Sequence, residues 1–170
     1  MTDQKKSLYQ TAIQKMASLR PVSWFFARTL HHLDWIMLKL SGKRATLTSL
    51  LTGLPVVVVT TTGAKSGLPR TLPLLCIRTP EQPEQFALIA SNFGQRHNTG
   101  WYFNLKKNPR ADCLIQGQTR MYTAHEASEE EYEKYWQRAQ ATYIGFPLYK
   151  QRAGKRRIPI MVLEPENKEK

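Results

Sequence analysis

The sequence has only two cysteines, Cys76 and Cys113, which lie far apart and match no spacing typical of a metal site. Both lie in apolar segments, where a free thiol usually packs as a small hydrophobic side chain. We therefore expect no disulfide and no metal centre, and this cysteine usage favours the cytoplasm over an oxidising compartment.

A long hydrophobic run is also absent. A membrane-spanning helix needs roughly 18 consecutive apolar residues, whereas the most apolar early stretch, residues 22–40, contains Arg28, Asp34 and Lys39. The N-terminus begins with charged residues and has no apolar signal-peptide core. We expect neither a transmembrane segment nor a cleaved leader.

Acidic side chains are scarce relative to basic ones. The chain has 13 Asp and Glu against 25 Lys and Arg, which gives a formal net charge of +12. This excess favours an anionic partner, which can be nucleic acid, an acidic lipid surface, or a phosphorylated or carboxylated ligand. Charge alone does not choose among them.

The motifs of covalent catalysis are missing as well. There is no G-x-S-x-G, no paired Cys and His, and no pair of carboxylates in a polar loop. The acids gather between Glu126 and Glu133 at a predicted helix start, where capping and the helix dipole account for them. An enzyme with this sequence would take its reactive group from a cofactor.

What the sequence does contain is enough apolar material for one folded domain, with 41% hydrophobic residues in a chain of 170. Helical periodicity predicts two amphipathic helices at residues 7–19 and 22–40. They either pack on the domain or a second subunit, or lie peripherally on a membrane surface. Further along, β-branched and alternating segments predict six strands. These strands span residues 54–62, 70–78, 86–91, 111–116, 119–125 and 158–163.

The helices predicted between these strands are few. A short helix at residues 99–107 ends before a proline, and a capping box at Ser128 to Glu131 begins a helix that reaches about residue 142. Residues 143–154 are predicted to be irregular. We therefore predict the α+β class: a small barrel of about six mostly antiparallel strands, with flanking helices and an N-terminal helical extension.

The loop at residues 60–71 is the most informative segment. It follows a strand, contains two glycines, and places Lys65, Ser66 and Arg70 close together. Glycines let main-chain amides approach an anion, while the cations and hydroxyls supply charge and donors. The order matches neither a Walker loop nor a dinucleotide fingerprint. The loop is either an anion cradle or a solvated hairpin turn.

A second polar segment, residues 90–105, combines hydroxyl, amide and imidazole groups with large aromatics. Trp101 and Asn104 share one helix face, which suits a flat heterocycle that needs stacking and hydrogen bonds. The alternative is that Trp101 belongs to the core and Asn104 is a local cap. His97 has no carboxylate or cysteine at a ligand spacing, so we do not expect it to bind a metal.

The third segment is aromatic, at residues 143–149, and a basic stretch follows it. Aromatics interleaved with cations can mark nucleic-acid binding, but no accompanying motif supports that function here. For most of these cations a solvated surface is the simpler interpretation. The basic residues are Lys150, Arg152, Lys155, Arg156 and Arg157.

Taken in order, these segments resemble the deazaflavin (coenzyme F-420)-dependent nitroreductase family, whose members are split β-barrel, FMN-binding-like proteins. The matching stretches include T-T-G-A-K-S-G-L-P-R, P-L, A-S-N-F-G, the run from His97 to Pro109, and I-P-I-M-V-L-E-P. They extend over roughly residues 40–165. The resemblance implies a deazaflavin-binding barrel at residues 43–165, preceded by the helices of residues 1–42 and followed by a charged tail at 166–170.

The resemblance also implies a site. Lys65, Ser66 and Arg70 would hold the anionic tail of the cofactor, and the acceptor would meet an aromatic wall that includes Phe146. The implied catalytic residues are Ser91, Tyr143 and Tyr149. The implied cofactor-binding residues are Lys65, Ser66, Gly67, Arg70, Thr71, Pro73, Leu74, Ala90, Ser91, Asn92, Trp101 and Asn104.

The implied activity is hydride transfer from reduced coenzyme F-420 to an electron-poor acceptor: a quinone, an enone or a nitroaromatic. Two departures from the family pattern are Phe146, where some members have tyrosine, and Asn98-Thr99, where a proline commonly precedes the tryptophan. Two alternatives remain: a related barrel reductase that binds FMN, and a non-enzymatic basic protein that binds nucleic acid or an acidic membrane. A monomer and a homodimer both fit the sequence.

Overall fold

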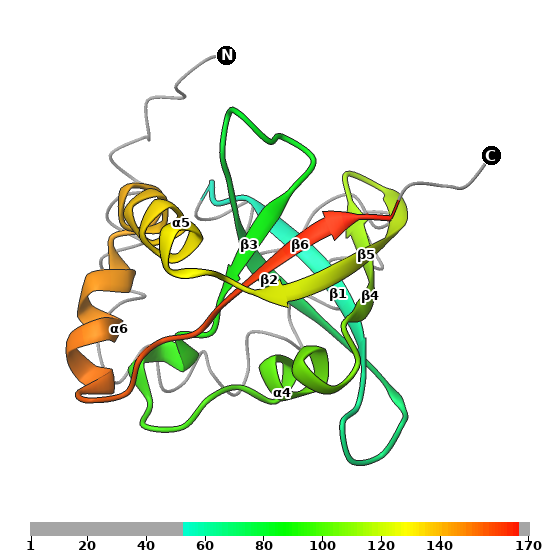
Figure 1. Cartoon of the computed structure of the whole chain (residues 1–170), viewed down its shortest axis with the longest axis horizontal. Helices are drawn as coiled ribbons and strands as arrows, with labels where there is room; N and C mark the ends of the chain where they lie inside the picture. Colours follow the sequence, from blue (N-terminus) through cyan, green and yellow to red (C-terminus); the bar gives the residue numbers. More distant parts are fainter. Residues whose placement is uncertain (1–52, 167–170) are drawn as a thin grey trace.

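The computed structural model describes residues 53–166, so the helices predicted at 7–19 and 22–40 and the boundary at residue 42 lie outside the described residues. Within residues 53–166 the chain forms a closed six-stranded antiparallel barrel in the order β1-β2-β3-β6-β5-β4 (Figure 1). The strands are β1 (Val56–Thr62), β2 (Pro69–Arg78), β3 (Phe86–Ile89), β4 (Arg110–Ile115), β5 (Gln118–Glu126) and β6 (Ile160–Pro165). The helical elements are η1 (Asn92–Gly94), α4 (Gly100–Lys107), α5 (Glu129–Thr142) and α6 (Gly145–Ala153). The predicted α+β barrel is confirmed.

The barrel interior is filled by side chains from alternate positions of the strands, as the two-residue period of a strand requires. Val57 and Val59 of β1 are fully buried there with Phe86, and Trp101 of α4 belongs to the same cluster. The β4–β5 hairpin turns at Gln116 and Gly117, both of which have positive φ (51° and 83°), as a tight hairpin turn demands. This turn lies between the strands predicted at 111–116 and 119–125.

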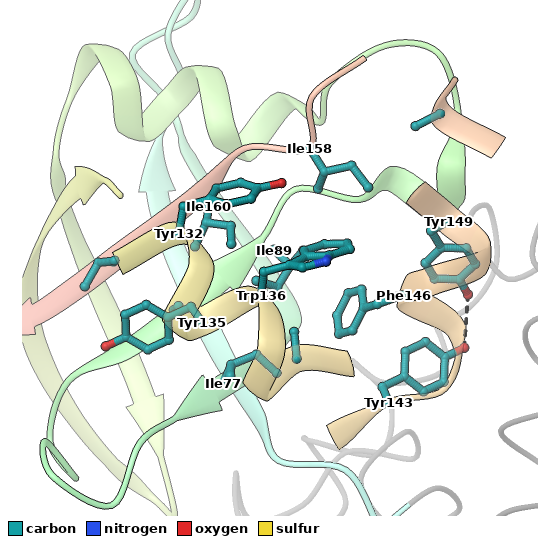
Figure 2. Packing of buried hydrophobic residues seen from close by; sticks show 14 of the residues in the cluster. Ile77, Ile89, Tyr132, Tyr135, Trp136, Tyr143, Phe146, Tyr149, Ile158 and Ile160 are labelled. Atoms are coloured by element: carbon teal, nitrogen blue, oxygen red, sulfur yellow. Dashed lines mark hydrogen bonds between the residues drawn. The ribbon is translucent and has the colours of Figure 1, made fainter. Parts of the chain in front are cut away.

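A second layer covers the outside of the barrel. Helices α5 and α6 pack together on one side of it, and their aromatic side chains contact apolar residues on the outer faces of β2, β3 and β6 (Figures 1 and 2). Within residues 53–166, none of the helices combines the length and the apolar character that a membrane crossing requires.

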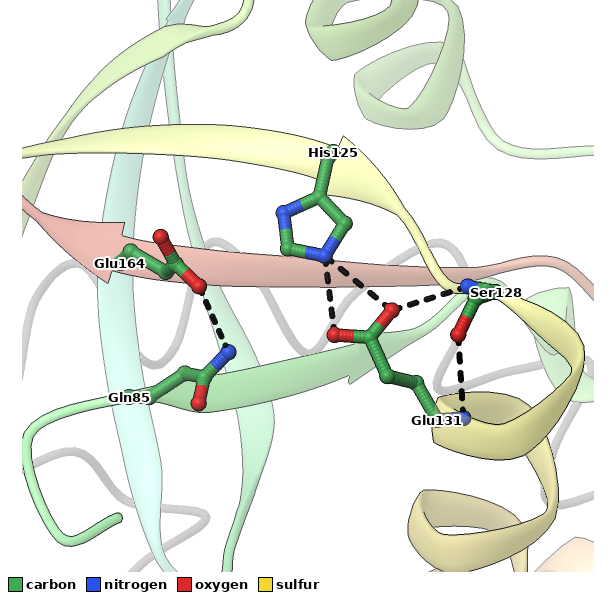
Figure 3. A network of polar contacts seen from close by, with 5 residues as sticks. All are labelled: Gln85, His125, Ser128, Glu131 and Glu164. Carbon is green, nitrogen blue, oxygen red and sulfur yellow. Dashed lines mark hydrogen bonds and ion pairs between the residues drawn. The ribbon is translucent and has the colours of Figure 1, made fainter.

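The start of α5 confirms the predicted capping box. The Ser128 Oγ accepts from the Glu131 main-chain NH at 3.3 Å, and the Glu131 carboxylate accepts from the Ser128 NH at 2.9 Å (Figure 3). The same carboxylate lies 3.0 Å from the His125 Nε2. The acidic cluster therefore begins a helix, as the sequence predicts.

The prediction that residues 143–154 are irregular is wrong, because residues 145–153 form α6. Pro147 stands in the first turn, where its missing NH would have no partner inside the helix, so it does not interrupt the helix. Gly154 ends the helix at a φ of 64°. The last strand also begins two residues later than predicted, at Ile160.

Along part of its length, β2 pairs with a strand on one side only within residues 53–166. β2 pairs with β1 from Pro69 to Leu75, but it pairs with β3 only from Cys76 to Arg78. Pro73 therefore lies where β2 has no β3 neighbour to receive a main-chain NH, which is the edge position that its missing donor predicts. If the β2–β3 register continued, Pro73 and Leu74 would lie across from Ser91 and Ala90.

Candidate active site

The loop between β1 and β2 presents its cations to solvent. The loop closes on itself through the Gly63 NH, which donates to the Leu68 carbonyl at 2.9 Å, and Gly67 adopts a φ of 68°. Lys65, Ser66 and Arg70 are all exposed, and the Arg70 Nη2 lies 3.5 Å from the Ser66 Oγ. No carboxylate among residues 53–166 pairs with either cation. The donor set is suited to a multiply charged anion.

Helix α4 holds this loop in place through Asn104. The Asn104 Oδ1 accepts from the Ala64 NH at 2.9 Å, and the Nδ2 donates to the Thr61 Oγ1 at 3.0 Å. The Lys107 Nζ adds a bond to the Ala64 carbonyl at 2.7 Å. Both ends of the Asn104 amide are thus engaged by the loop, and these bonds fix the position of the loop relative to α4.

The segment from Ala90 to Asn98 is held by Arg156, a residue that the sequence did not single out as functional. Its guanidinium donates to four oxygens, none of them a carboxylate. They are the carbonyls of Ser91 (2.8 Å), Gln95 (3.0 Å) and Ala90 (3.2 Å), and the Asn98 Oδ1 (2.6 Å). Partial burial lowers the pKa of Arg156 from its ordinary value.

Helix α6 packs directly on η1. This contact joins the polar segment at residues 90–105 to the aromatic segment at residues 143–149. A Cβ at Gly94 would lie 2.7 Å from the Arg152 Cβ and 3.0 Å from the Tyr149 carbonyl oxygen, and Gly94 has a φ of 80°. Only glycine fits that approach without strain. The Phe93 ring contacts the Tyr149 ring edge-on at 5.8 Å. The η1 turn after β3 and helix α6 therefore form one packed unit.

A buried pair of phenols links the end of α5 to α6, because Tyr143 directly follows α5 and Tyr149 lies within α6. The Tyr143 and Tyr149 hydroxyls lie 3.0 Å apart, and the Tyr143 ring packs edge-on against Phe146 at 5.4 Å (Figure 2). Burial, followed by the neighbouring Tyr149, raises the pKa of Tyr143 far above its ordinary value. The phenol is therefore neutral at physiological pH and can donate a hydrogen bond.

The remaining predicted residues divide between the barrel interior and its surface. Trp101, only 6% exposed, lies in the inner cluster, against which Leu74 also packs. Pro73 points to the other face of β2, because it alternates with Leu74 along the strand. The structure thus separates Trp101 from the cluster of Tyr143, Phe146 and Tyr149 that forms part of the outer layer.

The other residues of the site lie at its edges. Thr71 shares a hydrogen bond with Thr60 at 2.9 Å, and Ser91 is buried. Asn92 has a φ of 49° and donates to the His97 carbonyl at 3.0 Å. The Thr99 hydroxyl, which precedes α4, is buried and has no hydrogen-bond partner among residues 53–166. The segment at residues 90–105 therefore links the other two, because α4 contacts the β1–β2 loop and η1 contacts α6.

Comparison with known proteins gives a consistent result. The model of the F420H(2)-dependent quinone reductase family matches residues 35–165. An F420H(2)-dependent quinone reductase of Mycobacterium tuberculosis is 30% identical over 111 residues, which cover 64% of this chain and 72% of that protein.

Two solved structures are also similar to this chain. An F420-H2 dependent reductase, FDR-A, is 34% identical, with a TM-score of 0.58 over 65% of this chain and 94% of that one. A domain-swapped dimer is 30% identical, with a TM-score of 0.60 over 77% of this chain and 98% of that one.

Proposed function

This chain belongs to the F420H(2)-dependent quinone reductase family and is a deazaflavin-dependent oxidoreductase, and from that premise we propose how its residues hold the cofactor and the acceptor. Bound coenzyme F-420 supplies a two-electron hydride, so the protein needs to bind, orient and shield the reactants. The observation that carries the proposal is the exposed pair Lys65 and Arg70, which has no carboxylate partner among residues 53–166.

The β1–β2 loop binds the phosphate and polyglutamate tail. Lys65 and Arg70 provide charge, Ser66 provides a hydroxyl, and the φ of 68° at Gly67 shapes the turn that presents them. Asn104 and Lys107 keep the loop at one position relative to α4, which lowers the entropy lost when an anion binds. A flexible loop with the same charges would bind the tail less tightly.

The deazaflavin ring lies along the open edge of β2. Within residues 53–166, β3 pairs with β2 only as far as Cys76, and a continued register would bring Pro73 across from Ser91. Arg156 holds the Ala90 and Ser91 carbonyls in place. Pro73 and Ser91 thus form the ring site, while Ala90, Trp101 and Leu74 support it from the barrel interior.

The acceptor lies on the α6 side of this site. A hydride added to a quinone or enone leaves negative charge on an oxygen, which hydrogen-bond donors stabilise. The Tyr143–Tyr149 hydroxyl pair and Ser91 are the donors that we assign to it. Phe146 lacks a hydroxyl, so it contributes an apolar wall and no proton.

The test is a coenzyme titration of the double variant Lys65→Ala plus Arg70→Ala, which we expect to bind coenzyme F-420 at least about tenfold more weakly. The matched control is Lys134→Ala plus Arg157→Ala, which removes the same charge from cations that pair with Glu81 and Glu129. Equal affinities of the two double variants would overturn the tail site. Tighter binding of FMN than of coenzyme F-420 would overturn the cofactor assignment.

Turnover is measured as oxidation of the reduced coenzyme with a menadione-type quinone, a nitroimidazole and a cyclic enone. We expect the quinone to be the best acceptor, as the family membership indicates. Membrane contact through residues 1–42 and homodimer formation are further parts of the proposal. Co-sedimentation with anionic vesicles and light scattering test these two parts separately.

A further inference from the structure

A hollow of about 250 Å³ opens at the end of the barrel opposite the β1–β2 loop. At the loop end, Thr61 pairs with Arg70 and Ala111. The hollow is lined instead by the far end of β2 at Arg78 and by the β4–β5 hairpin at Ile115. It shares no residue with the cofactor site described above.

Two arginines line this hollow from positions that face the barrel interior. Along β2, Arg78 alternates with Ile77 and so shares the face of Cys76, which belongs to the inner cluster. Along β5, Arg120 stands two residues before Tyr122, another member of that cluster. The Arg120 side chain is 54% exposed and lies at the mouth of the hollow, whereas Arg78 is half-buried. Barrel interiors are normally filled by apolar side chains, so the inner guanidinium of Arg78 calls for a partner.

Arg78 is only partly satisfied, because its guanidinium interacts with the Cys76 thiol but not through every donor. Its Nε is buried and makes no hydrogen bond within residues 53–166. A buried donor left without an acceptor costs about 1–3 kcal/mol. The cost is recovered when an acceptor enters the hollow.

The charge of the lining is positive. Glu84 is the one carboxylate among the lining residues, and it pairs with Arg120 at 3.0 Å. The other ionisable groups of the lining are the Cys113 thiol and the Tyr122 phenol, and burial raises the pKa of each. Two arginines and one glutamate leave a single positive charge, beside the apolar surfaces of Ile115 and Tyr122.

We propose that this hollow is a second binding site, for a small organic monocarboxylate whose carboxylate is held between Arg78 and Arg120. Planar guanidiniums match a carboxylate with paired hydrogen bonds. The single net charge suits a monoanion, and the apolar wall suits an aliphatic or aromatic body. The volume is smaller than the 300–1,000 Å³ typical of sites for drug-sized ligands, so the ligand is about the size of benzoate.

The experiment is calorimetric titration of the full-length protein with benzoate, with neutral benzamide as the isostere. We expect benzoate to bind at least about tenfold more tightly than benzamide. Arg120→Gln removes a donor and leaves Glu84 unpaired, so it weakens benzoate binding by about tenfold or more. Glu84→Gln frees Arg120 and tightens binding about threefold or more.

The control is Arg110→Gln, which removes an exposed arginine that pairs with Glu166 at the other end of the barrel. It leaves benzoate affinity unchanged. Arg78→Met tests the inner arginine, and the Arg120 and Glu84 variants decide the matter if that variant fails to fold. Equal binding of benzoate and benzamide, tighter binding of inorganic phosphate, or shifts of the same sign in the Arg120 and Glu84 variants would overturn the proposal.

Discussion

The Arg156 guanidinium donates from Nη2 to the main-chain carbonyl of Ser91 at 2.8 Å. This bond joins the loop after α6 to the residue that follows the end of β3 by two positions. Because Arg156 bonds four oxygens and no carboxylate, no ion pair within residues 53–166 neutralises its charge. It orders the Ala90–Asn98 segment and also places positive charge behind it.

We expect Arg156→Gln to lower the free energy of unfolding by about 2–4 kcal/mol, since several part-buried carbonyls lose their donor. Arg156→Lys restores only part of this loss, because one ammonium cannot replace a planar fork. Urea unfolding measures both variants. The neighbouring Arg157→Gln is the control, with a clearly smaller expected loss, because that side chain is exposed. Equal losses at the two positions would contradict the assigned role.

We expect Asn104→Ala to weaken coenzyme binding although Asn104 makes its hydrogen bonds to the loop. The substitution removes both the acceptor for Ala64 and the donor to Thr61. The expected loss is about 1–3 kcal/mol of stability, with a lower affinity for the tail because the loop is no longer preorganised.

Asn108→Ala is the control, since it removes one exposed, long bond of 3.4 Å to Thr62. Thermal unfolding and coenzyme titration measure both variants. A normal affinity in Asn104→Ala would show that the loop does not need this anchor.

Two buried tyrosines should respond oppositely to loss of the hydroxyl. The Tyr135 hydroxyl is buried and has no hydrogen-bond partner among residues 53–166, so Tyr135→Phe should be neutral or stabilise by up to about 1 kcal/mol. Tyr143→Phe breaks the 3.0 Å bond to Tyr149 and should cost about 1 kcal/mol. Only Tyr143→Phe should also lower kcat with a quinone. Equal kcat values in the two variants would remove Tyr143 from the acceptor site.

Stability should fall at alkaline pH because of the buried Cys113 thiol. Burial, then the nearby Asp112 and Cys76, raises its pKa from an ordinary 9.0 to about 12. Above pH 9 the unfolded thiol ionises while the folded one keeps its proton, so the unfolded state binds fewer protons and stability declines. This stabilisation is complete below pH 9 and is lost as the pH rises toward 12.

The expected slope for this one group is about 1.4 kcal/mol per pH unit. Urea unfolding at several pH values between 9 and 11 measures the slope for the native chain and for Cys113→Ala. The variant should show a shallower decline, whatever its absolute stability. Identical slopes would show that the thiol does not titrate differently in the two states.

The local sequence determined much of the fold, because the strands, turns and helix starts depend on residues that are neighbours along the chain. The valine-rich run made β1 predictable through its β-branched side chains. Gln116-Gly117 marked the hairpin turn, and Ser128 with Glu131 marked the start of α5. For the site, the Lys65–Arg70 loop could be predicted to be basic and glycine-rich from the order of its residues alone.

Only the tertiary structure decided what each polar side chain of the site does, because its hydrogen-bond partners lie far away in the sequence. Nothing in the basic stretch distinguishes Arg156 from Arg157, yet one bonds four oxygens about 60 residues earlier and the other is exposed. Residues 145–153 are helical because their aromatic side chains pack on η1 and α5, a contact that a local pattern does not encode. Short-range propensity sets the strands and turns, whereas long-range packing and hydrogen bonding set the roles of the site residues.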